Sequence, residues 1–110
     1  LFVFCLVLKK QMVRPKRCKR IFFQPGITYF KPAGVPMRAL KEEIISYEEI
    51  EVIRLIDLKE QDQKKVAEKM KISQPTLSRL LKEGRKKISN ALVNGNAIKI
   101  QGGNFEVHGN

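Results

Sequence analysis

Cysteine and histidine are scarce in this chain of 110 residues. The two cysteines, Cys5 and Cys18, are too few for the disulfide framework of a small secreted domain. They lack the CxxC spacing of a zinc site, and the single histidine, His108, belongs to the C-terminal tail. We therefore expect no bound metal and a protein suited to the reducing cytoplasm.

The sequence also lacks the motifs on which enzyme chemistry depends. It has no glycine-rich phosphate-binding loop and no nucleophile with a histidine partner. The glutamates between residues 42 and 62 lie in an acidic helical segment, where a solvated face or a contact with the basic arm at 12–41 explains them more simply than a catalytic pair. We expect a protein that is not an enzyme, with no catalytic residue and no cofactor.

Long hydrophobic runs are missing as well. The apolar run Leu1–Leu8 has eight residues, whereas a membrane-spanning helix needs roughly 20, so no stable membrane span is expected. The run also lacks the flanks of a signal peptide. Because Met12 opens a plausible start, we interpret residues 1–11 as an upstream or non-native extension, with a short interfacial anchor as the alternative.

Positive charge is abundant and unevenly distributed, with a formal net value of +11. No acidic residue precedes Glu42, eight acidic residues lie between Glu42 and Asp62, and the stretch from Gln63 to Lys99 is basic again. Uniform solubilising charge would not produce such blocks. A basic chain of this kind attracts polyanions, among which nucleic acid is the commonest, and an anionic membrane surface is the competing target.

Proline punctuates the chain after Met12, at positions 15, 25, 32 and 36. This density excludes a long helix, so residues 12–41 are predicted to form a basic arm of turn and coil, with short extended pieces near 20–24 and 27–30. Helical signals begin with the capping box of Ser46 and Glu49, and the helix that it starts is predicted to end near Leu58.

Two further helices are predicted, one from about Asp62 to Met70 and a longer one from Gln74 to about Val93. Ser73 has the side chain of an N-cap, and Pro75 suits the first helical turn, where a missing N–H is harmless. Gly84 lies on the apolar stripe of the longer helix. A glycine there costs about 1 kcal/mol in helix propensity, so we expect it to permit close approach of another helix.

The expected fold is mainly α. Residues 42–93 are predicted to form a helix-turn-helix bundle of three main helices, preceded by the irregular proline-rich arm at 12–41. Residues 94–110 are predicted to form a short β element, in which two strands pair as a small hairpin, followed by a tail.

The stretch from Gln63 to Lys82 follows the pattern of a helix-turn-helix. A small alanine stands where two crossing helices come closest, and apolar residues stand where they pack. Lys71 departs from this pattern, because the turn usually has a glycine there to adopt positive φ; we expect a strained or slightly different turn. The positions that fit the pattern are Val66, Ala67, Met70, Ile72, Leu77 and Leu80.

The outward face of the longer helix distinguishes a DNA-binding pair from an ordinary helical hairpin. Its first part is polar, and in a helix-turn-helix this part enters the major groove, where Gln pairs with adenine and Arg with guanine. The predicted base-reading residues are Gln74, Thr76, Ser78, Arg79 and Lys82. The predicted phosphate contacts are Arg14, Lys16, Arg17, Lys19, Arg20, Arg85, Lys86 and Lys87.

Residues 12–103 resemble an uncharacterised family of small prokaryotic proteins. The matching stretches are MVRPKRCKRI, YFKPAGVP, EEIEVIRLIDL, VAEKMKISQPTLSRLLKEGRKKI and AIKIQGG. The resemblance implies DNA binding through a domain similar to region four of bacterial sigma factors, and no known enzymatic activity. Lys71 replaces the family's usual glycine, and Gly84 stands where another small residue is usual.

The function predicted from these observations is that of a DNA-binding transcriptional regulator with double-stranded DNA as its partner. An RNA- or ribosome-associated basic protein is the first alternative, in which the arm at 14–20 dominates binding. An adaptor that touches RNA polymerase through its acidic helix is the second. A homodimer, in which a second copy of the chain is the partner, is a further alternative.

Overall fold

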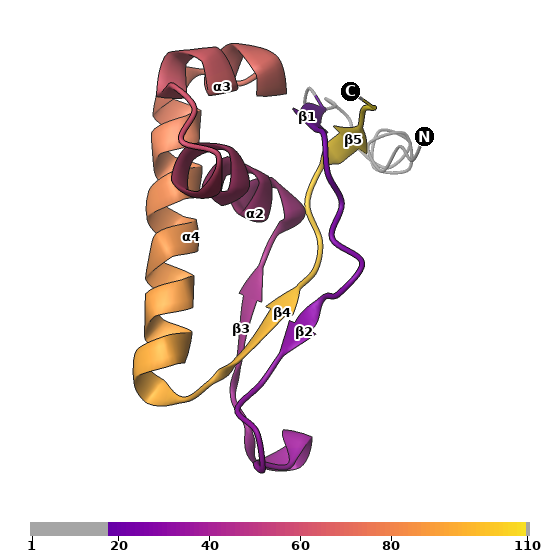
Figure 1. The fold of residues 1–110 in the computed structure, drawn as a ribbon, viewed down its shortest axis with the longest axis vertical. Coiled ribbons are helices and arrows are strands. Elements are labelled where there is room, and N and C mark those ends of the chain that lie inside the picture. The colour runs from indigo at the N-terminus through magenta and orange to yellow at the C-terminus, as the bar shows by residue number, and fades with distance from the viewer. Residues whose placement is uncertain (1–17, 110) are drawn as a thin grey trace, which may run out of the picture.

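The computed structural model describes residues 18–109, and helices and short strands alternate along them (Figure 1). The three helices are α2 (Tyr47–Ile53), α3 (Gln63–Met70) and α4 (Gln74–Asn94). Helix α2 continues into a π-helical turn, η2 (Arg54–Leu58), and a short 3-10 turn, η1 (Met37–Ala39), lies in the loop before β3. The three predicted helices are therefore confirmed, with the first one changing its helical type after Ile53.

Two small sheets join segments that are far apart in the sequence. Strand β1 (Lys19–Ile21) pairs in parallel with β5 (Phe105–Val107). Strand β4 (Ala97–Ile100) lies between β2 (Tyr29–Phe30), which is antiparallel to it, and β3 (Glu42–Ile45), which is parallel. The fold is thus mixed α/β, not mainly α as predicted.

The predicted C-terminal hairpin is wrong. Strands β4 and β5 follow each other closely in sequence, but each pairs with strands from the first half of the chain. Gly102 and Gly103, with φ of 82° and 124°, carry the chain from one sheet to the other. An isolated two-stranded hairpin is at best marginally stable, and these strands gain more by completing sheets that pack on the helices.

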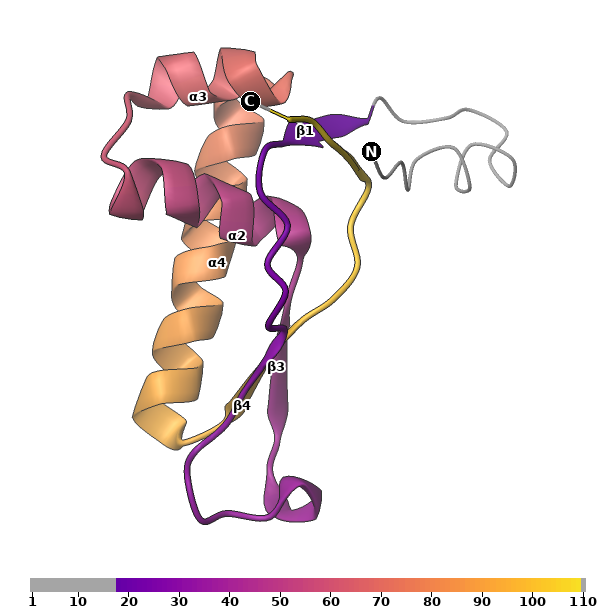
Figure 2. The same ribbon diagram turned by 45° about the vertical axis from the view of Figure 1, so that its right-hand side comes forward.

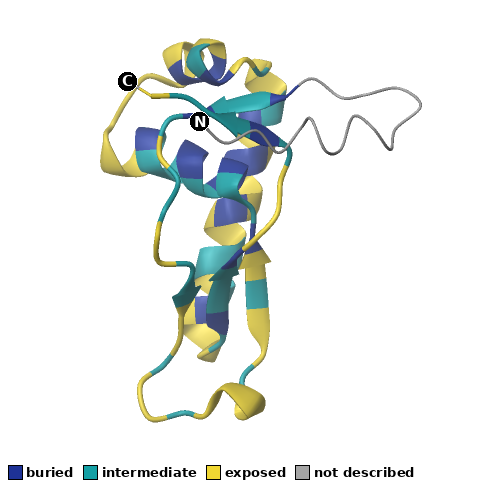
Figure 3. Ribbon diagram, turned by 90° about the vertical axis from the view of Figure 1, so that its right-hand side faces the viewer, coloured by how far each residue is buried: buried dark blue, intermediate teal, exposed yellow. Residues whose placement is uncertain are grey.

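Helix α4 is the longest element, and the rest of the molecule is arranged along it. In Figures 1 and 2, α2 and α3 lie across one half of α4, and the sheet of β2, β3 and β4 lies beside the other half. The loop that carries η1 projects at the sheet end and is exposed (Figure 3). The helical end and the sheet end are therefore distinct parts of the surface.

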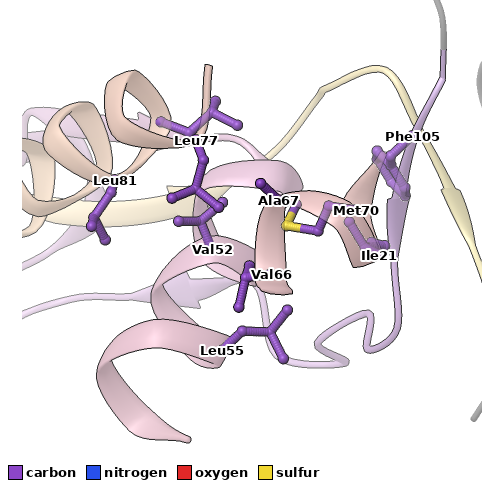
Figure 4. Close-up of a cluster of buried hydrophobic side chains, with 10 residues drawn as sticks. Ile21, Val52, Leu55, Val66, Ala67, Met70, Leu77, Leu81 and Phe105 are labelled. Carbon is purple, nitrogen blue, oxygen red and sulfur yellow. The ribbon is translucent and has the colours of Figure 1, made fainter. Parts of the chain in front are cut away.

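The hydrophobic core lies where the helices meet the β1–β5 pair (Figure 4). Ile21 of β1 and Phe105 of β5 are almost fully buried against the helices. The helix pair α3–α4 is therefore supported by strands from both ends of the described chain. The other members of this core are Val52, Leu55, Val66, Ala67, Met70, Leu77, Leu80 and Leu81.

Gly84 confirms the prediction made from its place on the apolar stripe. A Cβ atom at this position would lie 2.7 Å from Cδ1 of Ile53 in α2 and 3.4 Å from Cβ of Glu49. The first distance is shorter than van der Waals contact allows. The absence of a side chain at Gly84 thus lets α2 pack closely on α4.

Candidate nucleic-acid interface

The turn between α3 and α4 keeps the left-handed conformation that usually calls for glycine. Lys71 adopts φ 61° and ψ 44°, and its N–H donates to the carbonyls of Ala67 and Glu68 at the end of α3. A residue with a Cβ atom is strained in this region by about 1 kcal/mol. The turn therefore has the geometry expected of a helix-turn-helix although lysine replaces glycine, and the backbone of Lys71 is strained.

Helix α4 begins with the cap that the sequence predicts. The hydroxyl of Ser73 accepts a hydrogen bond from the N–H of Thr76 at 3.2 Å, and Pro75 occupies the first turn. The same hydroxyl donates to Oγ1 of Thr76 at 2.9 Å, so the side chain of Thr76 is half-buried beside the cap. Of the predicted base-reading residues, Thr76 thus faces away from the most exposed part of the helix.

The other four predicted base-reading residues lie together on the exposed side of α4. Ser78, Lys82 and Lys86 follow one another at four-residue steps, and Arg79 lies within the face that they form. Leu77, on the opposite side of the helix, is fully buried. Within residues 18–109, no hydrogen bond or ion pair holds the side chains of this outward face, which we define as Gln74, Ser78, Arg79, Lys82 and Lys86.

Several predicted phosphate contacts are engaged within the protein. The ammonium group of Lys87 lies 2.9 Å from Oε1 of Glu49, and that of Lys19 lies 3.2 Å from Oε2 of Glu48. Arg20 is half-buried in β1. Arg14, Lys16 and Arg17 lie outside the described residues.

Arg85 forms a more open ion pair with Asp57, the second-to-last residue of the π-helical turn η2 (54–58). Its Nε and Nη2 donate to the two carboxylate oxygens at 3.1 and 2.6 Å. Both side chains stay accessible, 53% for Arg85 and 37% for Asp57. Hydrogen bonding to the guanidinium lowers the pKa of the Asp57 carboxyl, and that of Arg85 is raised in turn.

Three glutamates on α2 form a structural network, of which the sequence predicted only contact with basic residues, as one of two interpretations. Glu48, Glu49 and Glu51 are all buried, and each joins α2 to another segment. Glu48 accepts from the N–H of Asn104, in addition to its contact with Lys19. Glu49 closes the capping box by accepting from the N–H of Ser46 at 2.9 Å.

Glu51 is the most completely buried of the three. Its carboxylate accepts from the N–H of Phe22 at 2.8 Å and from Nε and Nη2 of Arg54 at 2.9 and 3.0 Å. The acidic block between basic segments was the only sequence signal of this network. Because charges are buried only when paired, such a block on a predicted central helix suggests internal partners.

No helix between residues 18 and 109 has the length and apolar character needed to cross a membrane. Over the same residues, no group of three or more His, Cys, Asp or Glu side chains is placed to hold a metal ion.

The fold and this surface define a small mixed α/β domain whose longest helix presents a polar, basic face. The family model described as "Protein of unknown function DUF134" matches residues 9–108. The chain therefore belongs to this family, and that part of the predicted resemblance is confirmed.

Curated relatives of this chain bear the name UPF0251 protein. A UPF0251 protein of Thermoanaerobacter pseudethanolicus is 47% identical over 97 residues, covering 88% of this chain and 82% of the relative. A UPF0251 protein of Pelotomaculum thermopropionicum is 47% identical over 87% of this chain and 73% of its own length. One from Desulforudis audaxviator is 50% identical over 86% of this chain and 62% of its own length. No solved structure matches the chain.

Proposed function

We propose that this protein binds double-stranded DNA through α4 and acts as a transcriptional regulator. The observation that carries the proposal is the outward face of α4, whose polar and cationic side chains are exposed and unengaged within the described chain. The helix beneath them is held by the shared core, so the face is presented on a rigid support. A helix of this kind, preceded by a shorter helix and a tight turn, fits the major groove.

The chemistry of the outward face matches the needs of groove binding. Gln74 and Arg79 carry side chains that form paired hydrogen bonds to adenine and guanine, respectively. Lys82 can also pair with guanine, and Lys86 supplies a cation for phosphate oxygens, which contribute most of the affinity. As in helix-turn-helix proteins generally, the N-terminal half of the second helix of the pair would contact the bases.

The two alternatives have less support. An adaptor that uses its acidic helix needs accessible carboxylates, whereas Glu48, Glu49 and Glu51 are buried and paired within the protein. An RNA-binding protein needs a cationic surface but not the mixed donor and acceptor side chains of Gln74 and Ser78. The deep, narrow major groove of an RNA helix would exclude α4.

The proposal is tested by selecting duplexes from a random DNA library with the whole chain and measuring affinity for the preferred site by fluorescence anisotropy. Arg79→Ala is expected to cost roughly 1–3 kcal/mol on that site and to relax discrimination at one base pair. Lys41→Ala is the matched control, because it removes an exposed cation near the C-terminal end of α4, away from Arg79. It should change affinity much less than Arg79→Ala.

Two results would contradict the proposal. Equal weakening of all duplexes by Arg79→Ala would make Arg79 a phosphate contact and remove the base-reading assignment. Tighter binding of the wild-type protein to an RNA hairpin than to every selected duplex would favour the RNA-associated alternative.

A further inference from the structure

The ion pair between Arg85 and Asp57 joins the α4 surface to η2, the turn that continues α2. Its side-on geometry uses Nε and Nη2 of the guanidinium and leaves the remaining N–H donors free. Asp57 is itself held by the widened helical turn, in which the N–H of Lys59 donates to the carbonyl of Arg54 at 2.9 Å. The backbone that carries Asp57 is therefore held by this turn, and its carboxylate is an acceptor beside the long Arg85 side chain.

Arg85 shares its side of α4 with the first residues of the outward face. It follows Gln74 by eleven positions and Ser78 by seven, which are three and two helical turns. At a rise of 1.5 Å per residue, Arg85 lies about 16 Å beyond Gln74 along the helix axis. The major groove is about 12 Å wide, so a helix that places Gln74 at the bases brings Arg85 to the phosphates of the groove wall.

We propose that Asp57 is a positioning residue that holds Arg85 for contact with a DNA phosphate. This inference rests on the proposed function and adds to it a residue outside the recognition helix. The guanidinium is oriented before DNA arrives, so less side-chain freedom is lost on binding. Its unused N–H groups remain available to phosphate oxygens.

Asp57 has a second, opposing effect, because its negative charge weakens the attraction of Arg85 for DNA. The two effects predict opposite results for Asp57→Ala. If positioning dominates, the preferred duplex is bound about three- to tenfold more weakly, as expected when one side chain must be ordered on binding. If neutralisation dominates, removal of the carboxylate makes binding tighter and more dependent on salt.

The experiment measures affinity for the selected duplex across a range of salt for the wild type, Asp57→Ala, Arg85→Ala and the double variant. We expect Asp57→Ala to flatten the slope of log affinity against log salt by up to about 0.9, the contribution of one phosphate contact. We expect it to have no further effect once Arg85 is absent. Asp57→Asn, which keeps an acceptor oxygen, should lie between the wild type and Asp57→Ala and serves if the alanine variant does not fold.

Tighter binding by Asp57→Ala, or an unchanged slope with a lower melting temperature, would overturn the positioning role. Lys86→Ala provides the control for an exposed cation with no carboxylate partner in the described chain, and it should lose one phosphate contact whatever stands at position 57. Absence of DNA binding by the wild type would refute the proposed function as well. Wild-type binding that depends on Arg79 but not on Asp57 would refute this inference alone.

Discussion

Glu51→Ala provides the most direct test of the network that holds the fold together. The Glu51 side chain has no exposed surface, and its carboxylate accepts hydrogen bonds from Arg54 and from the backbone N–H of Phe22. Alanine removes the acceptor and leaves both donors in place. The segment after β1 would then lose its polar attachment to α2.

The expected cost follows from the burial of each group. Removing one partner of a buried ion pair typically costs about 3–5 kcal/mol, and the lower end applies because Arg54 keeps 20% of its side chain exposed to water. The unpaired N–H of Phe22 adds about 1 kcal/mol. We therefore expect the free energy of unfolding to fall by about 3–4 kcal/mol, a large share of the 5–15 kcal/mol usual for a domain.

The measurement is urea unfolding followed by far-ultraviolet circular dichroism, with the wild type and Glu83→Ala measured in parallel. Glu83 is exposed on α4 without a partner in the described chain, so its variant should stay within about 0.5 kcal/mol of the wild type. The Glu51→Ala, Arg54→Ala double variant should lose less than the sum of the single losses. A loss below about 1 kcal/mol for Glu51→Ala, at an unchanged denaturant slope, would refute the structural role assigned to this carboxylate.

Three further predictions concern the turns and the exposed ion pair. Lys71→Gly should raise the free energy of unfolding by up to about 1 kcal/mol, because glycine relieves the positive φ of 61°; no gain in urea unfolding would argue against strain at this turn. Gly103→Ala should lower the melting temperature, since its Cβ would lie 1.9 Å from Oε1 of Glu48; an unchanged melting curve would contradict that contact. Because Arg85 lowers the pKa of Asp57, their pair stabilises the fold above the ordinary carboxyl pKa of about 3.9 and ceases to do so as the pH falls through the lowered value. Melting curves of Arg85→Ala and the wild type should thus differ slightly at pH 7 and coincide in strong acid, and a difference that grows in acid would count against the assignment.

The features that the sequence alone predicts are local ones. Ser46 and Ser73 cap their helices through hydrogen bonds that reach only three residues along the chain, so the residue order is sufficient to find them. The apolar stripe of α4 and its polar opposite face follow from helical periodicity in the same way. Gly84 was identified because a glycine on such a stripe has a physical cost that close packing explains.

Long-range pairing depended on the tertiary structure. Strand β1 meets β5 across most of the chain, and strands of two to four residues carry too little periodicity for their partners to be inferred. Whether a given cation is paired within the protein could not be predicted either, because Lys87 and Lys82 are both lysines of the same predicted helix. Lys87 lies 2.9 Å from a buried carboxylate, whereas Lys82 faces solvent. Residue order determines which side chains a helix carries, but only the packing of neighbouring segments determines which charges are already paired.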